Sequence, residues 1–121
     1  MLIDEREEIM NEAIQTLMNR IVADYNDWTN HCAKGELSET NLEMMERFEA
    51  AVDYKVGNKY IRLFQGGSVW GFVVNTENDK QFNYGDILMA AGYNKPARNK
   101  ARGNVFDLEN TRVQWTGANY L

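Results

Sequence analysis

Residues 59–75, KYIRLFQGGSVWGFVVN, decide the fold of this 121-residue chain. The first half of the stretch alternates with a period of two, which is typical of a half-buried β-strand. The second half, Ser68–Asn75, is rich in β-branched and aromatic residues, and the glycine pair between the halves is a tight-turn signal. Gly71 inside this second strand indicates a bulge or a close backbone approach. The alternation puts Tyr60, Arg62 and Phe64 on one face of the first strand and Ile61 and Leu63 on the other.

The rest of the chain after residue 53 is predicted to complete an antiparallel sheet of four or five strands with one short inserted helix. The period of two begins at Tyr54. Asp86 is a candidate N-cap for a short helix over Ile87–Ala91, which Gly92 would end. Pro96 favours an irregular segment after that helix. The last two strands are expected at Gly103–Phe106 and Thr111–Trp115, joined around residues 107–110.

Residues 4–33 are predicted to form one long helix, because apolar residues recur every three or four positions and no proline or glycine occurs before Gly35. About 30 residues at roughly 1.5 Å each span about 45 Å, far more than the roughly 13 Å radius of a domain this size. Ser38 is a good N-cap for a second helix about half as long. The apolar stripes are Met10, Ile14, Leu17, Ile21, Tyr25, Trp28 and Cys32 in the first helix and Leu42, Met45, Phe48, Ala51 and Val52 in the second.

A helix of this length needs a partner along its apolar stripe. The second helix covers part of the stripe, and we expect another subunit to cover the remainder, which predicts a homodimer. The alternative is a monomer whose helical hairpin packs on the sheet. The expected fold class is α+β, with a helical oligomerisation region in residues 1–53 and a ligand-binding sheet region in residues 54–121, together in one compact domain.

The net charge of −5 hides an uneven distribution. Residues 1–53 carry 13 acidic and 4 basic residues, whereas residues 54–121 carry 5 acidic and 9 basic residues and 11 of the 14 aromatic residues. A surface that is both basic and aromatic suits phosphates and nucleobases. The acidic half would repel a long polyanion such as duplex DNA, so the expected partner is a small anion in a local basic pocket.

Several functional classes lack the residues they need. No run approaches the roughly 20 apolar residues of a membrane helix, and the acidic N-terminus has no signal-peptide pattern. A single cysteine, Cys32, suits a reducing compartment, so we expect a cytosolic protein. The single histidine, His31, adjoins Cys32, and two adjacent ligands do not make a zinc site. No glycine-rich phosphate loop occurs either. With one histidine and few carboxylates in the second half of the chain, we expect no cofactor, no metal and no catalysis.

Residues 93–104, YNKPARNKARGN, carry the strongest binding signal. Arginine presents a planar fork to phosphate, which makes Arg98 and Arg102 candidate ligands of a pyrophosphate. Asparagine can pair with the donor and acceptor edges of a purine, which adds Asn99 and Asn104 as candidates. The two lysines of the segment are expected on its solvated rim.

The aromatic residues of the sheet region divide into expected core and expected site. Phe82 follows a polar turn at an expected sheet edge, where a base could stack on its ring. Arg62 either lines the same pocket or forms a salt bridge with the acidic helices. The residues expected in the core are Trp70, Phe72, Phe106 and Trp115.

The motifs SVWGFVV, GDILMAAGY, NKPARNKARGNVF and WTGANYL resemble the first type of Thoeris anti-defence protein, which bacteriophages carry. The resemblance covers about residues 59–121. It implies a protein that sequesters cyclic ADP-ribose isomers without cleaving them and that forms dimers through long helices. Such dimers can assemble into hexamers, and some members also hold cyclic oligonucleotides at separate sites. The resemblance further implies ligand contacts by Arg102 and Asn104, with Arg98 and Phe82 carried over more loosely.

The expected function is therefore a non-enzymatic sponge for a nucleotide signal. A sponge must compete with a receptor, which requires nanomolar binding, about −12 kcal/mol. Three alternatives stay open: an inhibitor that docks its acidic helices on a host protein, a single-stranded nucleic-acid binder that uses the aromatic sheet, and an enzyme that hydrolyses the nucleotide.

Overall fold

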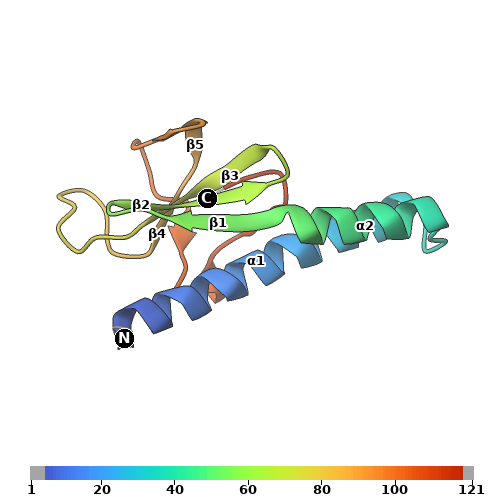
Figure 1. The fold of residues 1–121 in the computed structure, drawn as a ribbon, viewed down its shortest axis with the longest axis horizontal. Helices are drawn as coiled ribbons and strands as arrows, with labels where there is room; N and C mark the ends of the chain where they lie inside the picture. The colour runs from blue at the N-terminus through green and yellow to red at the C-terminus, as the bar shows by residue number, and fades with distance from the viewer. Residues whose placement is uncertain (1–4, 119–121) are drawn as a thin grey trace.

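Two helices precede an antiparallel sheet in the computed structural model, which describes residues 5–118 (Figure 1). The expected α+β class is confirmed. The five strands of the main sheet run in the order β1-β2-β3-β4-β7, and each neighbouring pair is antiparallel. The elements are α1 (Glu5–Cys32), α2 (Glu39–Ala51), β1 (Val52–Val56), β2 (Tyr60–Gln65), β3 (Ser68–Val74), β4 (Asp86–Leu88), β5 (Ala90–Gly92), β6 (Lys95–Pro96), β7 (Gly103–Asn104) and the 3-10 helix η1 (Leu108–Asn110).

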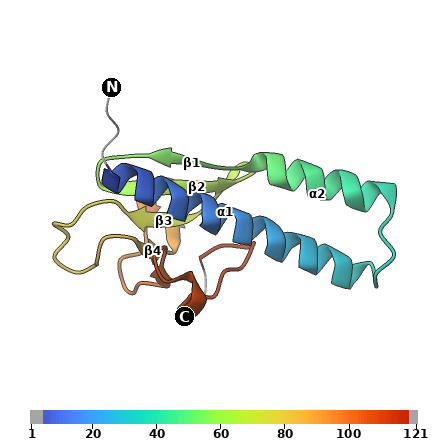
Figure 2. The ribbon, with the colours of Figure 1, turned by 90° about the horizontal axis from the view of Figure 1, so that it is seen from below.

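The long helix α1 crosses one face of the sheet (Figure 2). Its residues Met10, Ile14, Leu17 and Ile21 are buried in the same core as the strand residues Ile61, Leu63, Val73 and Ile87. The alternation predicted for β2 is confirmed, because its residues on this face are buried and those on the other face are partly exposed. Within residues 5–118, neither helix combines the length and the apolar composition that crossing a bilayer requires.

The far end of α1 packs against α2 and the C-terminal segment of the same chain. The ring of Tyr25 stacks on Phe48 of α2, with their centres 4.0 Å apart, and meets the edge of Trp115 at 5.1 Å. The chain itself therefore covers the stripe of α1 as far as Tyr25. Trp28 and Cys32, the last two residues of the predicted stripe, are exposed in the single chain.

The predicted N-cap of α2 is confirmed as a reciprocal capping box. The hydroxyl of Ser38 accepts from the backbone N–H of Asn41 at 3.1 Å, and the side-chain oxygen of Asn41 accepts from the N–H of Ser38 at 3.0 Å. These bonds satisfy N–H groups that a helix start leaves unpaired. The helix ends at Ala51, one residue earlier than predicted, because Val52 already pairs with Gln65 in the sheet.

The short helix predicted over Ile87–Ala91 is wrong, because this segment contains the strands β4 and β5. Ile87 is buried in the core beneath α1, whereas Leu88 is buried on the opposite side of the sheet, so neighbouring residues point to opposite faces. Asp86 does not cap a helix. Its carboxylate accepts from the N–H of Asn83 at 2.9 Å and stabilises the turn before β4. Pairing with β3 and β7 overrides the local helix signal.

The hairpin predicted between Gly103–Phe106 and Thr111–Trp115 is also wrong. β7 pairs with β4, and the residues between the two expected strands form η1. The chain then docks on β3: the indole N–H of Trp70 donates to the carbonyl of Gln114 at 2.6 Å, and the N–H of Ala118 donates to the carbonyl of Trp70 at 3.0 Å.

Gly71 sits where the sequence predicted a bulge or a close approach, and both occur. The register between β2 and β3 shifts next to its partner Leu63. A Cβ added at Gly71 would lie 2.9 Å from the Cβ of Ala118 and 2.9 Å from the carbonyl oxygen of Leu88. The absence of a side chain therefore lets the C-terminal segment pack on the sheet.

The other face of the sheet carries a smaller core beside the β5–β6 hairpin, on the opposite side from α1 (Figure 1). Phe72 is buried in this core and Trp70 in the core beneath α1, as predicted, and Trp115 is partly buried. Phe106 is not a core residue. It is 45 % exposed and stacks on Tyr84 with ring centres 5.7 Å apart.

Candidate functional site

The open face, which we define as the sheet face turned away from α1, gathers basic and aromatic side chains on neighbouring strands. Lys55 of β1 lies directly opposite Arg62 of β2, and Arg62 lies directly opposite Phe72 of β3. Tyr60 lies two residues before Arg62 on the same face and packs edge-on against Phe72, with ring centres 5.9 Å apart. The sheet register thus places two cations and two rings side by side, because directly opposed residues share a face.

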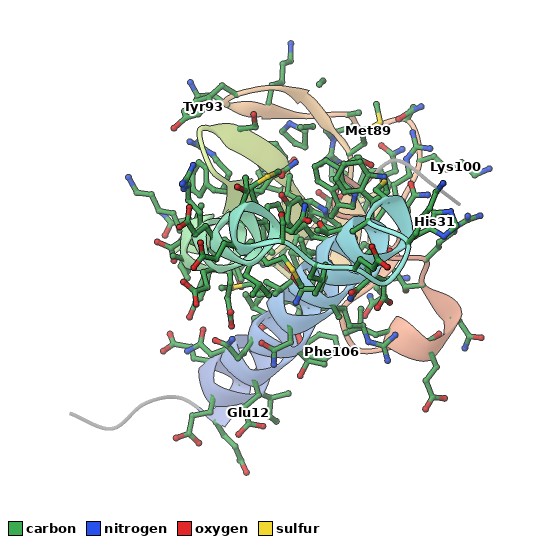
Figure 3. The ribbon with its side chains drawn as sticks, turned by 90° about the vertical axis from the view of Figure 1, so that its right-hand side faces the viewer. Glu12, His31, Met89, Tyr93, Lys100 and Phe106 are labelled. Atoms are coloured by element: carbon green, nitrogen blue, oxygen red, sulfur yellow. The ribbon has the colours of Figure 1, made fainter. Side chains whose placement is uncertain are left out.

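Arg62 occupies the centre of this face, surrounded by three rings. Its guanidinium carbon lies 5.2 Å from the ring centre of Tyr93 and 5.8 Å from those of Phe64 and Phe72. Figure 3 shows Tyr93 on the side of the molecule opposite Glu12 of α1. Because α1 covers the other face of the sheet, Arg62 points away from the acidic helix α1. Of the two roles expected for Arg62, a salt bridge to the helices or a place in a pocket, the geometry supports the pocket.

Two adjoining clefts open on this face. The first, here called the aromatic cleft, has a volume of about 280 Å³, and the second, the polar cleft, has about 440 Å³. Asn58 and Lys59 line both clefts, so the two clefts adjoin each other. The aromatic cleft is lined by Lys55, Tyr60, Arg62, Phe72 and Asn94 among others, and the polar cleft by Thr76, Asn78, Asp79, Lys80 and Arg98.

Arg98 lines the polar cleft and is hydrogen-bonded to Tyr60 of the aromatic cleft. Its guanidinium donates to the carboxylate of Asp79 at 2.9 Å and to the hydroxyl of Tyr60 at 2.5 Å. The hydrogen bond from Arg98, together with those from the N–H groups of Gln81 and Phe82, holds the pKa of Asp79 well below its ordinary value. Arg98 lines the polar cleft with 35 % of its side chain exposed, but two nitrogens of its guanidinium already bond to Asp79 and Tyr60.

Phe82 is not the exposed stacking platform that the sequence suggested. The residue is 7 % exposed and belongs to the smaller core with Phe72 and Leu88. The guanidinium of Arg98 covers it, with 4.9 Å between the guanidinium carbon and the ring centre. The physical reason is the turn at Asp79, which accepts from the N–H of Phe82 and folds the ring inward.

The other candidates of residues 93–104 do not converge with Arg98. Asn104 is engaged within the protein: its side-chain N–H₂ donates to the carbonyl of Tyr84 at 3.1 Å and to Asp86 at 3.0 Å. The backbone N–H of Arg102 donates to Ile87 next to β7. Asn99 is exposed. Among the described residues that line the two clefts, Arg62 and Arg98 are the members of the predicted set.

Several polar or cationic cleft residues were not among the predicted ligands, including Lys55, Lys59, Lys80, Tyr60 and Asn94. The alternation of β2 already placed Tyr60 on the face of Arg62, which was a usable signal. Lys55 needed the register of β1 against β2, which is a tertiary property. Lys59 and Lys80 needed the spatial approach of two turns to one another.

Two further clefts are less suited to an anion. A cleft of about 460 Å³ at the start of α1 contains Arg6, but Arg6 forms a salt bridge with Glu77 and lies next to Glu7. Another, beside Trp28, includes the two acids Asp24 and Asp27. Among residues 5–118, no group of three His, Cys, Asp or Glu side chains is placed to hold a metal ion.

No family model matches this chain, and neither the curated proteins nor the solved structures contain a match to it.

Proposed function

We propose that the two joined clefts of the open face bind a small phosphate-bearing nucleotide and hold it without cleaving it. The observation that carries this proposal is the charge of the clefts. Five cationic side chains line them against one carboxylate, Asp79, which Arg98 already pairs. Such an excess of positive charge in a concave site favours an anion. The five cations are Lys55, Lys59, Arg62, Lys80 and Arg98.

The shape and chemistry of the clefts favour a nucleotide over a bare anion. The aromatic cleft offers the rings of Tyr60 and Phe72 beside the amide of Asn94, a combination that suits a nucleobase. The polar cleft offers two lysines, Lys59 and Lys80, which suit phosphate.

The side chains of the clefts also favour binding over chemistry. Among the described residues that line them, Asp79 is the one carboxylate, and histidine and cysteine are absent. Because Asp79 is held ionised by Arg98, it is a poor general acid near neutral pH. A protein that sequesters a signal needs affinity and no catalytic group.

The particular ligand that we propose is a cyclic ADP-ribose isomer, and the particular function is a bacteriophage sponge that removes this Thoeris signal in the host cytoplasm. This narrower proposal rests on the resemblance of residues 59–121 described above. A compact ligand that carries a diphosphate and an adenine matches the charge and the rings of the two clefts.

We also propose that two copies of the chain associate through the helical end. α2 has no buried residue in the single chain, and Leu42 and Met44 of α2 and Trp28 of α1 are all exposed. Burial of these side chains against a second copy would remove apolar surface from water. Light scattering coupled to size exclusion tests this, and a monomer at micromolar concentration contradicts it.

Calorimetric titration of the intact protein tests the binding proposal. The ligands are cyclic ADP-ribose isomers, AMP, a cyclic oligonucleotide and a linear single strand. We expect a cyclic ADP-ribose isomer to bind most tightly and to be recovered unchanged after the protein is denatured by heat. Altered ligand would show an enzyme, and preference for the linear strand with a steep salt dependence would show a nucleic-acid binder.

The variant Lys59→Ala locates the site, because Lys59 lines both clefts. Loss of a charge-assisted contact should weaken binding about tenfold or more. Lys100→Ala is the matched control, since Lys100 is an exposed lysine outside the residues that line the two clefts. Equal affinities of the two variants for the ligand would show that the clefts are not the binding site.

A further inference from the structure

We propose that the second carboxylate oxygen of Asp79 accepts a hydrogen bond from a free sugar hydroxyl of the ligand. The ligand is then a ribonucleotide that keeps at least one unmodified C2′ or C3′ hydroxyl on the ribose that carries its phosphate. This inference rests on the proposed function and adds to it the part of the ligand that the polar cleft recognises.

The two oxygens of the Asp79 carboxylate have different surroundings. Oδ1 accepts from the guanidinium of Arg98 at 2.9 Å, from the N–H of Gln81 at 2.8 Å and from the N–H of Phe82 at 2.9 Å. Oδ2 is buried and has no hydrogen-bond partner among the described residues. The side chain is 1 % exposed, so the three bonds to Oδ1 hold it in one place.

A buried carboxylate oxygen without a donor is costly, because it has given up its hydration and gained nothing in return. A donor supplied by a ligand or by water recovers that cost. Asp79 is one of the residues that line the polar cleft, so the proposed contact requires that ligand binding opens its Oδ2 to the cleft. The polar cleft thus lies beside a fixed acceptor that lacks a donor among the described residues.

The composition of the polar cleft indicates which donor it suits. Its lining consists of polar and charged side chains, including Asn58, Thr76 and Asn78, and it contains the cations Lys59 and Lys80 within the same small volume. A hydroxyl donor close to a phosphate satisfies both the carboxylate and the lysines. A ribose 5′-phosphate offers both groups, because its C2′ and C3′ hydroxyls lie on the same small sugar as the phosphate-bearing C5′. An amine donor would add positive charge where three cations already lie.

The neighbouring aromatic cleft sets the orientation of the ligand. It contains the rings of Tyr60 and Phe72, whereas no aromatic residue occurs among the described residues that line the polar cleft. The base therefore enters the aromatic cleft and the ribose phosphate enters the polar cleft, with Lys59 at the junction. A second phosphate in place of the free hydroxyl would face the negative charge of Asp79, so a sugar that is phosphorylated at that position is disfavoured.

The test compares AMP with 2′-deoxy-AMP and 3′-deoxy-AMP by calorimetry on the intact wild-type protein. These probes share the base and the phosphate and differ by one hydroxyl. We expect at least one deoxy analogue to bind about tenfold or more weakly than AMP, as for a lost hydrogen bond to a charged group. In Asp79→Asn, which keeps an acceptor for Gln81 and Phe82, the difference should fall to about threefold or less, because hydrogen bonds between neutral groups are weaker.

Asp107→Asn is the matched control, because Asp107 is an exposed aspartate outside the residues that line both clefts, and this variant should discriminate as the wild type does. If Asp79→Asn does not fold, the amide resonances of Gln81 and Phe82 in the wild type replace it. AMP should shift them more than the disfavoured analogue does.

The outcomes separate the two proposals. If AMP and both analogues bind the wild type equally, the inference about Asp79 is overturned while the proposed function stands. If Asp79→Asn still distinguishes AMP from the deoxy analogue as strongly as the wild type does, the inference is also overturned, because another group then binds the hydroxyl. If no nucleotide binds the wild type at all, the proposed function itself is overturned, and the inference with it.

Discussion

The two faces of the sheet are built from alternating residues of the same strands, yet they have opposite character. The face beneath α1 is closed and apolar: Leu17, Ile14, Leu63 and Val73 have no exposed surface. The open face carries Lys55, Arg62 and the two clefts. One face therefore supplies most of the hydrophobic stabilisation, and the other is left free for a ligand.

Because the faces share their strands, binding and stability are separable only if each depends on its own side chains. A substitution beneath α1 should change stability with little effect on affinity, and a substitution at Arg62 should do the reverse. Substitutions on each face therefore test whether the two faces are independent.

Leu17→Ala removes a fully buried side chain from the face beneath α1. We expect it to lower the free energy of unfolding by about 2–5 kcal/mol, the range for a leucine truncation that leaves a cavity. Urea denaturation measures the effect. Ile9→Ala, at an isoleucine of α1 that is 51 % exposed, is the control and should cost about 0.5 kcal/mol or less. If Leu17→Ala lowers the free energy of unfolding no more than the control does, the core beneath α1 is not the main source of stability.

Arg62→Ala removes the central cation of the open face. Loss of a charge-assisted hydrogen bond should weaken nucleotide binding by about 1.5–3 kcal/mol, while the urea midpoint changes little. Calorimetry and denaturation on the same preparation measure both quantities. Arg47→Ala, at an exposed arginine of α2, removes the same charge away from the clefts and should bind as the wild type does. A large loss of stability in Arg62→Ala would mean that the two faces are not independent.

Gly71→Ala tests the close approach of the C-terminal segment to β3. The added Cβ would lie 2.9 Å from the Cβ of Ala118 and from a backbone oxygen, so the segment must shift, at a cost of about 1–3 kcal/mol. Thermal unfolding measures it. Gly67→Ala is the matched control, because a Cβ there meets no atom within 4 Å. Similar melting temperatures for both variants would argue against tight docking of the segment.

The ion pair between Asp79 and Arg98 predicts a small dependence of stability on acid. The pKa of Asp79 is lowered in the folded protein from its ordinary value of 3.8, chiefly by the hydrogen bond from Arg98. The resulting stabilisation is present above the unfolded pKa and is lost as the pH falls below it toward the folded value. Between roughly pH 5 and pH 2, the urea midpoint of the wild type should fall more than that of Asp79→Asn. Parallel curves would show that this pair does not contribute.

The helices and the first strands could be predicted from the sequence because their signals are local. The spacing of Met10, Ile14, Leu17 and Ile21 predicted α1, and Ser38 followed by Asn41 forms the cap that begins α2. The alternation in β2 correctly assigned its two faces. Each of these signals acts between residues a few positions apart, where backbone geometry alone determines which side chains share a face.

The strands after Asp86 could not be predicted in the same way. Asp86 and Gly92 carried the local signals of a short helix, but pairing of β4 with β3 and β7 prevailed. The expected C-terminal hairpin failed for a related reason, since residues 114–118 hydrogen-bond to Trp70 of β3 instead of to β7. Distant strand partners supply more hydrogen bonds and burial than these short local signals do.

The sequence by itself determined the α+β class, the long helix, the capped second helix and the chemical character of the second half of the chain, basic and aromatic. Tertiary structure alone decided which of those basic residues meet. It placed Lys55 opposite Arg62, drew Arg98 onto Asp79 and left Asn104 engaged within the protein. The physical reason is range: composition and periodicity act along the chain, whereas a binding site depends on strand register and on turns that bring distant residues together.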